Sequence, residues 1–312
     1  MRLFFLRPGA LGDTLLCAPA LAAARARWPG SHVALAGQSA AVDLLLAAGL
    51  VDLGLSHDDA RLTPLFGTSG DVASARFLLG DVSVAVAWLA DAEGIVGGSL
   101  RRLGAQQVIV APSVPPPEAG IHVADHLVAT LAGLGVAPLA EPLAPLLVAP
   151  ADAQDWADGF LGAARARPLP LVVLHPGSGG RRKNWHAAGF AAVAALLRQD
   201  HEVVVLAGPA DADAVAALLA GAESPFILAS DLTLRQVAAL LARAGAFLGN
   251  DSGVSHLAGL LGVPTVALFG PTEPRLWRPR GPAVTVLRWA AGPHSLAAAE
   301  VAATVAAVCR RP

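Results

Sequence analysis

The stretch from Gly249 to Thr272 constrains the fold of this chain more than any other. It follows an apolar run at residues 246–248, which is typical of a buried strand. Asn, Asp and Ser at residues 250–252 are good helix N-cap residues, and Gly262 suits the C′ position of the helix that they predict. Pro264 then opens a second apolar run, which ends in a Gly-Pro-Thr turn signal. Strand, tight polar turn, helix and strand together predict one βαβ unit.

The turn of this βαβ unit is suited to bind an anion. Its backbone N–H groups and helix dipole point out of the carboxyl edge of a parallel sheet, where a phosphate is readily bound. His256 falls in the first turn of the helix, near the same edge. An ordinary capped helix with a structural histidine explains this turn equally well, so the rest of the chain has to decide between the two.

Length and composition predict two α/β domains. At 312 residues the chain is too long for one ordinary core and suits two domains of about 150 residues each. Hydrophobic residues make up 54% of it and charged residues 15%, which favours buried parallel strands covered by Ala-rich helices. A net charge of −2 argues against a nucleic-acid partner. The apolar segments are too short or too interrupted to span a membrane.

The first residues and the cysteines predict a reduced, cytoplasmic protein. The apolar start is ended by Arg-Pro-Gly at residues 7–9 and is better explained as a first strand than as a signal peptide. Cys17 and Cys309 form no CxxC pair, so we expect neither a disulfide nor a structural zinc. The histidines show no metal-ligand spacing with a third ligand. We expect a monomer without a cofactor.

Strand and helix alternate in the first half of the chain. A strand at residues 2–6, a loop at 7–13 and a helix at 14–27 lead to a second strand at 32–36. The glycines of the loop keep it slim where it faces the sheet edge. Their spacing is not GxGxxG, so the dinucleotide fingerprint is absent. Residues 91–98 are expected to form a loop.

A proline-rich segment predicts the boundary between the domains. Four prolines within residues 136–150 are too many for a helix or a central strand, which indicates a linker. We therefore expect an N-terminal domain at 1–150 and a C-terminal domain at 151–312. The last helix, at 295–310, can belong to the second domain or return to the first.

Four segments, taken in order, resemble one family. They lie at residues 7–21, 175–185, 206–211 and 250–256, with 269–272 continuing the fourth. Each is weak alone, but together they resemble glycosyltransferase family 9, the ADP-heptose heptosyltransferases of lipopolysaccharide core synthesis. The resemblance implies a GT-B-type α/β fold of two facing Rossmann-like, doubly wound domains with a cleft between them. It also implies inversion at the anomeric carbon without a metal, with the first domain on the acceptor side and the second binding the nucleotide sugar.

The resemblance assigns the general base to Asp13, in the loop after the first strand. A base must deprotonate the acceptor hydroxyl, and its proximity matters more than a large pKa shift. From the residues alone, an N-cap for the helix at Thr14 is the favoured explanation of Asp13, and the resemblance reverses that preference. Gly12, in the same slim loop, is expected to contact substrate.

The departing diphosphate needs positive potential, which the second domain can supply. Ser178 and Gly179 expose backbone N–H groups, and Lys183 adds a charge that can reach a phosphate, so we count it as catalytic. By resemblance, a second phosphate and ribose site is formed by Asp251, Ser252, Gly253 and His256.

The nucleoside contacts are less specific. Asp211 matches an acidic residue that grips the ribose, but Asp stands here where Glu is usual, so its reach is shorter. Leu232 can pack on the base, although a core role explains it equally well. Asp211 and Asp213 form a DxD, which metal-dependent glycosyltransferases use for manganese. At a helix start this pair is better explained as N-terminal helix charge, so we predict no metal site.

The sequence leaves alternatives for the acceptor and for the reaction class. Residues 1–150 hold eight basic and twelve acidic residues, a balance of −4. A phosphorylated lipid acceptor should require a basic face, so a neutral or cationic small soluble acceptor is predicted. Another nucleotide sugar, or a nucleotide-sugar-binding protein without turnover, remains open, but Asp13 favours an enzyme. A sugar-nucleotide epimerase would need more acid and base groups.

Overall fold

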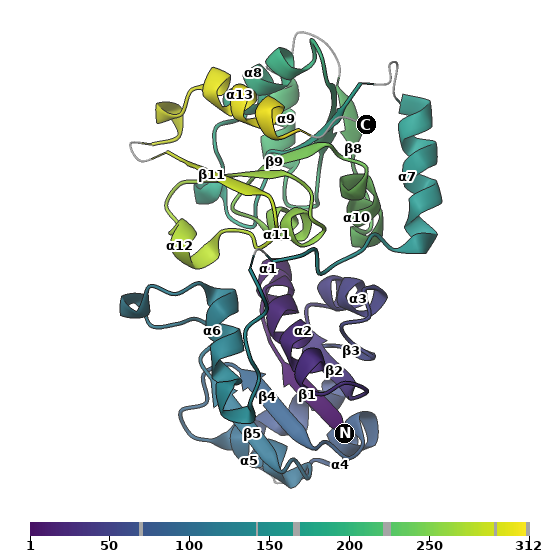
Figure 1. Cartoon of the computed structure of the whole chain (residues 1–312), viewed down its shortest axis with the longest axis vertical. Coiled ribbons are helices and arrows are strands. Elements are labelled where there is room, and N and C mark those ends of the chain that lie inside the picture. The colour runs from purple at the N-terminus through teal and green to yellow at the C-terminus, as the bar shows by residue number, and fades with distance from the viewer. Residues whose placement is uncertain (69–70, 142, 165–168, 221–225, 290–291, 310–312) are drawn as a thin grey trace. The chain divides into compact units, whose positions relative to one another are not determined.

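The computed structural model describes residues 1–68, 71–141, 143–164, 169–220, 226–289 and 292–309. The chain divides into two compact units, residues 1–140 and 141–312. Each unit is a parallel sheet covered by helices (Figure 1). Among the described residues, no helix is long and apolar enough to cross a membrane.

The first unit holds a five-stranded sheet in the order β3-β2-β1-β4-β5. All its pairings are parallel, with β1 in the middle. The apolar runs are buried because helices cover the sheet. The strands are β1 (Arg2–Leu6), β2 (His32–Gly37), β3 (Leu53–Ser56), β4 (Val84–Trp88) and β5 (Gln107–Ala111). The α-helices are α1 (Leu11–Leu15), α2 (Ala18–Arg27), α3 (Ser39–Ala47), α4 (Ala73–Leu79), α5 (Ile95–Arg102) and α6 (Val123–Thr130), and short 3₁₀ turns are η1 (Ala60–Phe66), η2 (Pro117–Ala119) and η3 (Ala132–Leu134).

The helix predicted at residues 14–27 is wrong in its start and in its continuity. It begins three residues earlier, as α1 at Leu11, and gives way to α2 at Ala18. Pro19 lies in the first turn of α2 and has no N–H to donate to the carbonyl of Leu15, so one continuous helix is broken there. The predicted loop at 91–98 is also wrong in part, since α5 begins at Ile95.

The second unit holds a six-stranded parallel sheet in the order β11-β10-β9-β6-β7-β8. The βαβ unit predicted from Gly249 to Thr272 is present as β9, α11 and β10. The strands are β6 (Leu171–His175), β7 (Glu202–Leu206), β8 (Ile227–Ala229), β9 (Ala246–Asn250), β10 (Thr265–Phe269) and β11 (Val284–Arg288). The helices are α7 (Ala151–Ala164), α8 (Ala187–Leu197), α9 (Ala212–Ala220), α10 (Leu234–Ala242), α11 (Gly253–Leu260), α12 (Pro274–Trp277) and α13 (Ala298–Val308), with turns η4 (Arg181–Lys183) and η5 (Pro293–Ser295).

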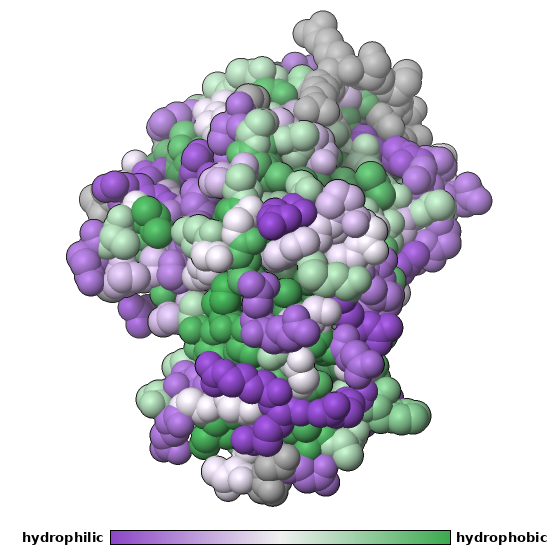
Figure 2. Space-filling view, turned by 60° about the horizontal axis from the view of Figure 1, so that its bottom comes forward, coloured by the Kyte–Doolittle hydropathy of each residue, from purple (hydrophilic) through white to green (hydrophobic). Residues whose placement is uncertain are grey.

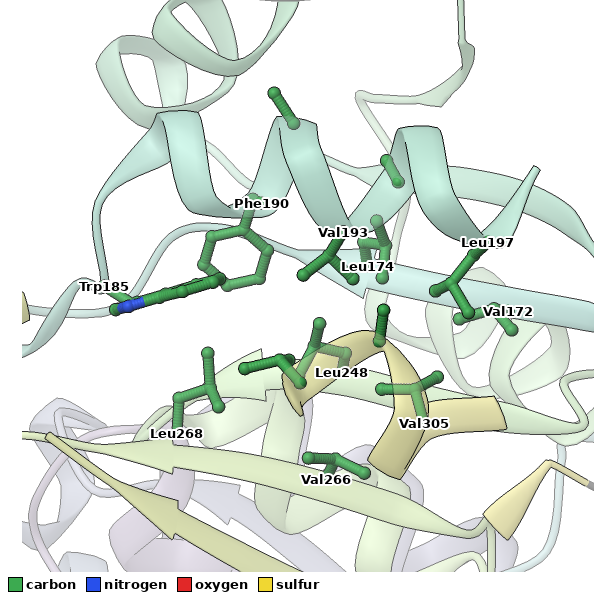
Figure 3. Packing of buried hydrophobic residues seen from close by; sticks show 14 of the residues in the cluster. Val172, Leu174, Trp185, Phe190, Val193, Leu197, Leu248, Val266, Leu268 and Val305 are labelled. Carbon is green, nitrogen blue, oxygen red and sulfur yellow. The ribbon is translucent and has the colours of Figure 1, made fainter. Parts of the chain in front are cut away.

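The main core of the second unit lies between its sheet and the helices α8 and α13. Figure 3 shows Trp185 and Phe190 side by side, above Leu268 and Leu248 of the sheet. Val305 of α13 joins the same cluster, so the last helix packs in the second unit.

The division between the units falls inside the predicted linker, after residue 140. The segment that follows it is already part of the second unit. The backbone N–H groups of Leu146 and Leu147 both donate to the carbonyl of Leu260, at 2.9 and 3.1 Å. Glu141 forms an ion pair with Arg280. The proline-rich segment is therefore partly structured, because backbone bonds and an ion pair attach it to its own unit.

Candidate functional site

The loop between β1 and α1 is folded around the carboxylate of Asp13. Arg7 Nη2 donates to Oδ1 at 2.9 Å, and the backbone N–H of Ala10 donates to Oδ2 at 2.9 Å. Gly9 has a φ of +143°, and a Cβ there would come within 2.8 Å of Oδ2, so the loop needs glycine at this position. The side chain of Asp13 is 28% exposed and that of Arg7 only 5%. The loop thus presents one anchored carboxylate at the carboxyl edge of the first sheet.

Asp13 also has a structural role, but a different one from that expected. It lies at the third position of α1, where its carboxylate caps the N–H of Ala10, and it is not the N-cap of a helix that begins at Thr14. Gly12 lies beside it in the same turn of α1. Burial raises the pKa of the nearby Cys17 thiol to about 12, so this cysteine stays protonated near neutral pH. Asp13 is the carboxyl group that the loop presents to solvent, with 28% of its side chain exposed, and its role as the base stays a prediction.

In the second unit, the side chain of Asn250 joins two loops that are far apart in the sequence. It is fully buried at the end of β9. Its Oδ1 accepts the backbone N–H of Trp185 at 2.9 Å, while Nδ2 donates to the carbonyls of Pro176 and Gly177 at 2.8 and 3.3 Å. Both ends of loop 176–185 are therefore fixed to the start of α11. The sequence marked Asn250 only as a capping residue, and no local pattern reveals this role.

An ion pair links the same two loops on their other side. Lys183 Nζ lies 2.9 Å from Asp251 Oδ2, with the lysine side chain 39% exposed and the aspartate side chain 5%. Ser252 is the N-cap of α11, and its hydroxyl accepts the N–H of Ser255 at 3.4 Å. The structure thus brings together Lys183, Asp251 and the N-terminus of α11. Their roles in binding stay predictions.

The other predicted residues of α11 lie at its start. Gly253 is the first residue of the helix, and His256 lies in the first turn with 4% of its surface exposed. The hydroxyl of Ser178 is used within its own loop, where it accepts the N–H of Gly180 and lies 2.6 Å from Asn184 Oδ1. Gly179 is exposed, and a Cβ there would meet nothing within 4 Å. Packing therefore does not explain glycine at this position.

A buried pair, His175 and Asp211, lies next to these loops. His175 Nε2 donates to Asp211 Oδ2 at 2.7 Å, and the N–H of Gly208 donates to the same oxygen at 2.8 Å. Although burial opposes ionisation, these hydrogen bonds and the histidine charge hold the pKa of the Asp211 carboxyl below its usual value. A Cβ on Gly177 would overlap Asp211, so glycine is required there. The sequence predicted a ribose contact for Asp211 and missed its partner.

The DxD at residues 211–213 does not bring its carboxylates to one ligand. Asp211 is buried against His175, whereas Asp213 is exposed and pairs with the exposed Arg181. In the described part of the chain, no group of three or more His, Cys, Asp or Glu side chains is placed to hold a metal ion. Leu232 is partly buried just before α10.

Comparisons with known proteins agree with this fold. The closely similar solved structures include the glycosyl transferase family 9 protein of Veillonella parvula DSM 2008, at 20% identity and a TM-score of 0.83, covering 98% of this chain and 96% of that one. The E. coli ADP-heptose lps heptosyltransferase II is 19% identical with a TM-score of 0.73, and the match covers 99% of this chain and 98% of that one. The E. coli heptosyltransferase WaaC with ADP is 17% identical with a TM-score of 0.72, and the match covers 99% of this chain and 100% of that one. At these identities the likeness shows the fold, and the predicted GT-B-type α/β class is confirmed.

The family itself is shown by sequence. A search of curated proteins found no match. The family model described as glycosyltransferase family 9 (heptosyltransferase) matches residues 134–300, which is more than half of the chain and includes both loops joined by Asn250. The chain is therefore a glycosyltransferase and belongs to family 9.

Proposed function

We propose that this glycosyltransferase moves a heptose from ADP-heptose to an acceptor hydroxyl, with inversion and without a metal ion. The observation that carries the proposal is the junction of loop 176–185 with the N-terminus of α11 through Asn250 and the Lys183–Asp251 pair. An ammonium group and the first N–H groups of a helix are what a diphosphate requires. The ADP bound to the structurally similar E. coli WaaC supports the choice of nucleotide. We further propose a monomer that acts in the cytoplasm without a cofactor.

The donor would be held by groups from four loops, those after β6, β7, β8 and β9. Ser178, Gly179, Ser252 and Gly253 supply backbone N–H groups to the phosphates, and His256 adds a side-chain donor. The oxygen of Asp211 that is not bound to His175 would accept from a ribose hydroxyl, and Leu232 would pack on the base. Because Asp251 already pairs with Lys183, an incoming diphosphate competes with a buried carboxylate for the ammonium. Donor binding is then expected to loosen the Lys183–Asp251 pair.

The transfer would be a single displacement. The acceptor oxygen forms a bond to the anomeric carbon on the face opposite the diphosphate, its proton passes to the carboxylate of Asp13, and the bond from the anomeric carbon to the ADP oxygen breaks. Each oxygen of Asp13 accepts one hydrogen bond and keeps a second lone pair for this proton. Lys183 would stabilise the charge that develops on ADP.

A donor screen tests this proposal. ADP-, GDP- and UDP-sugars are compared by thermal shift and by release of the nucleoside diphosphate, and the anomeric configuration of the product is read by NMR. We expect stabilisation and turnover with ADP-heptose, an inverted product, and unchanged turnover in EDTA because Asp211 and Asp213 engage separate partners. Turnover only with another donor would overturn ADP-heptose as the donor. A product of retained configuration would overturn inversion. A loss of turnover in EDTA that manganese restores would overturn the reaction without a metal.

Charge placement favours a second, narrower proposal, that the acceptor is neutral or cationic. At the carboxyl edge of the first sheet, the loops after β3, β4 and β5 carry the exposed carboxylates Asp58, Glu93 and Glu118. The one arginine in these loops, Arg61, is paired with Asp59. A phosphorylated acceptor would be repelled from such an edge.

Most arginines of the first unit lie at its opposite end. The last turns of α2, α4 and α5 hold Arg25, Arg27, Arg76, Arg101 and Arg102. Helices that follow parallel strands run back to the amino edge of the sheet, so these charges lie away from the loop of Asp13. Figure 2 faces the lower end of Figure 1, and strongly hydrophilic residues gather on that end of the first unit. The test offers ADP-heptose together with one of two kinds of acceptor: a phosphorylated, Kdo-bearing lipid, or a panel of amino sugars. Transfer to the Kdo lipid alone would overturn the proposal.

A further inference from the structure

Arg7 is a buried cation in the loop that presents Asp13. The residue is 4% exposed, and its Nε is buried without a hydrogen-bond partner among the described residues. Burying a guanidinium is costly, and an unsatisfied Nε adds to that cost. A buried ion pair is weak evidence for stabilisation, because apolar residues of similar volume often stabilise as well. Stability therefore does not account for arginine at this position.

The geometry of the guanidinium suggests what it does. Nη1 donates to the carbonyl of Pro8 at 2.6 Å, and Nη2 donates to Asp13 Oδ1 at 2.9 Å. One planar group thus connects the loop backbone to the carboxylate. The N–H of Ala10 holds the other oxygen, so the plane of the carboxylate is set by two donors on opposite sides. Without Arg7, one donor would remain and the terminal torsion of Asp13, which is intrinsically soft, would be free to turn.

We propose that Arg7 is a positioning residue for the transfer reaction. It holds the carboxylate of Asp13 so that a remaining lone pair of each oxygen faces solvent at the sheet edge. This inference rests on the proposed role of Asp13 as the base. A lysine cannot replace Arg7 fully, because a single ammonium does not reproduce the fork that binds Pro8 and Asp13 together.

The proposal is tested by steady-state kinetics. The substrates are ADP-heptose and the acceptor that the comparison of acceptors identifies. Arg7→Met is expected to lower kcat about 10²-fold, the effect of a small misplacement of a catalytic group, with ADP affinity by calorimetry unchanged. Arg7→Lys should recover part of the loss. Arg25→Met is the matched control, since it removes another arginine–aspartate pair of the same unit, 2.7 Å between Arg25 and Asp52, outside the loop. Wild-type kcat in Arg7→Met would overturn the proposal.

A double-mutant cycle separates positioning from direct contact with substrate. If Arg7 acts through Asp13, Arg7→Met should cost nothing further in an Asp13→Ala background. If the two substitutions instead lower kcat by independent factors that multiply in the double variant, the proposal is overturned. Wild-type kcat in Asp13→Ala alone would instead show that the proposed base is wrong.

Hydrogen exchange gives a readout that needs no substrate. The amide of Ala10 is protected by Asp13 Oδ2, so its exchange should become faster in Arg7→Met and stay unchanged in Arg25→Met. Unchanged exchange at Ala10 in Arg7→Met would show that Arg7 does not hold the carboxylate, whatever the reaction is.

Discussion

In the loop after β1 of the first unit, the carboxylate of Asp13 is held by residues close in the sequence, whereas the loops after β6 and β9 in the second unit are held together by residues far apart. Asp13 is bound by groups three and six residues away. Asn250 binds backbone groups that lie 65 to 74 residues away, and His175 binds a carboxylate 36 residues away. Both arrangements lie at the carboxyl edge of a parallel sheet.

The difference predicts how each region responds to mutation. The first loop has its own local donors, so changing it should affect chemistry more than folding. The contacts of the second region form only because the sheet places β6 between β7 and β9, which brings the loops after these strands together. Changes at its junction should therefore lower stability and ligand affinity together.

The largest expected effect is on turnover and comes from the local loop. Asp13→Ala should lower kcat about 10²–10⁴-fold, the range for a general base. Loss of the contact to Ala10 should lower the free energy of unfolding by about 1 kcal/mol, as for a helix cap, and the buried Arg7 left without its partner should add to that loss. Kinetics and urea unfolding check both numbers. Near wild-type kcat, or a stability loss that explains the drop in rate, would contradict the comparison.

The junction of the second unit should respond in the opposite way. Asn250→Ala leaves a buried N–H and carbonyl unpaired, which should lower the free energy of unfolding by about 3 kcal/mol and weaken ADP binding as well. Gln38→Ala is the matched control, because that amide caps α3 locally, accepting from Ala41 at 2.9 Å, and should cost about 1 kcal/mol. Chemical denaturation and calorimetry measure the two effects. Equal losses in both variants would remove the distinction between local and distant contacts.

Lys183→Ala should weaken binding of the phosphates more than binding of the nucleoside. We expect ADP affinity to fall by about 1.5–3 kcal/mol, the value of a charge-assisted contact, with adenosine affinity nearly unchanged. Arg181→Ala is the control, because its exposed pair with Asp213 should contribute little. Equal losses for ADP and adenosine, measured by calorimetry, would place Lys183 away from the phosphates.

The smallest expected effect is on pH dependence. The pKa of Asp211 is held below its ordinary 3.8 in the folded chain, so ionised Asp211 stabilises the fold above that pH. This contribution is lost as the pH falls through the lowered pKa. Urea unfolding between pH 7 and pH 3 should therefore show a shallower acid loss in Asp211→Asn than in the wild type. Identical pH slopes would show that the His175–Asp211 pair does not couple folding to protonation.

Patterns of the sequence were sufficient for the long apolar strands and failed where the local signal is weak. The strands at residues 2–6, 171–175 and 202–206 were predicted and are present. The short edge strand β3 was not predicted, because its four residues include Gly54 and show no clear alternation. The helix α5 begins in a glycine-rich stretch that looked like a loop. There the carboxylate of Asp91 accepts from the N–H groups of Val96 and Gly97 and starts the helix.

The sequence by itself determined the α/β class, the family, and the loops in which the candidate residues lie, because those depend on apolar periodicity and on short motifs. Only the tertiary structure decided what those residues contact. The guanidinium of Arg7 on Asp13, the amide of Asn250 across two loops and His175 on Asp211 all depend on how strands are ordered and how loops close. Such contacts leave no periodic signal, since a single side chain reaching a backbone group is compatible with many neighbouring sequences.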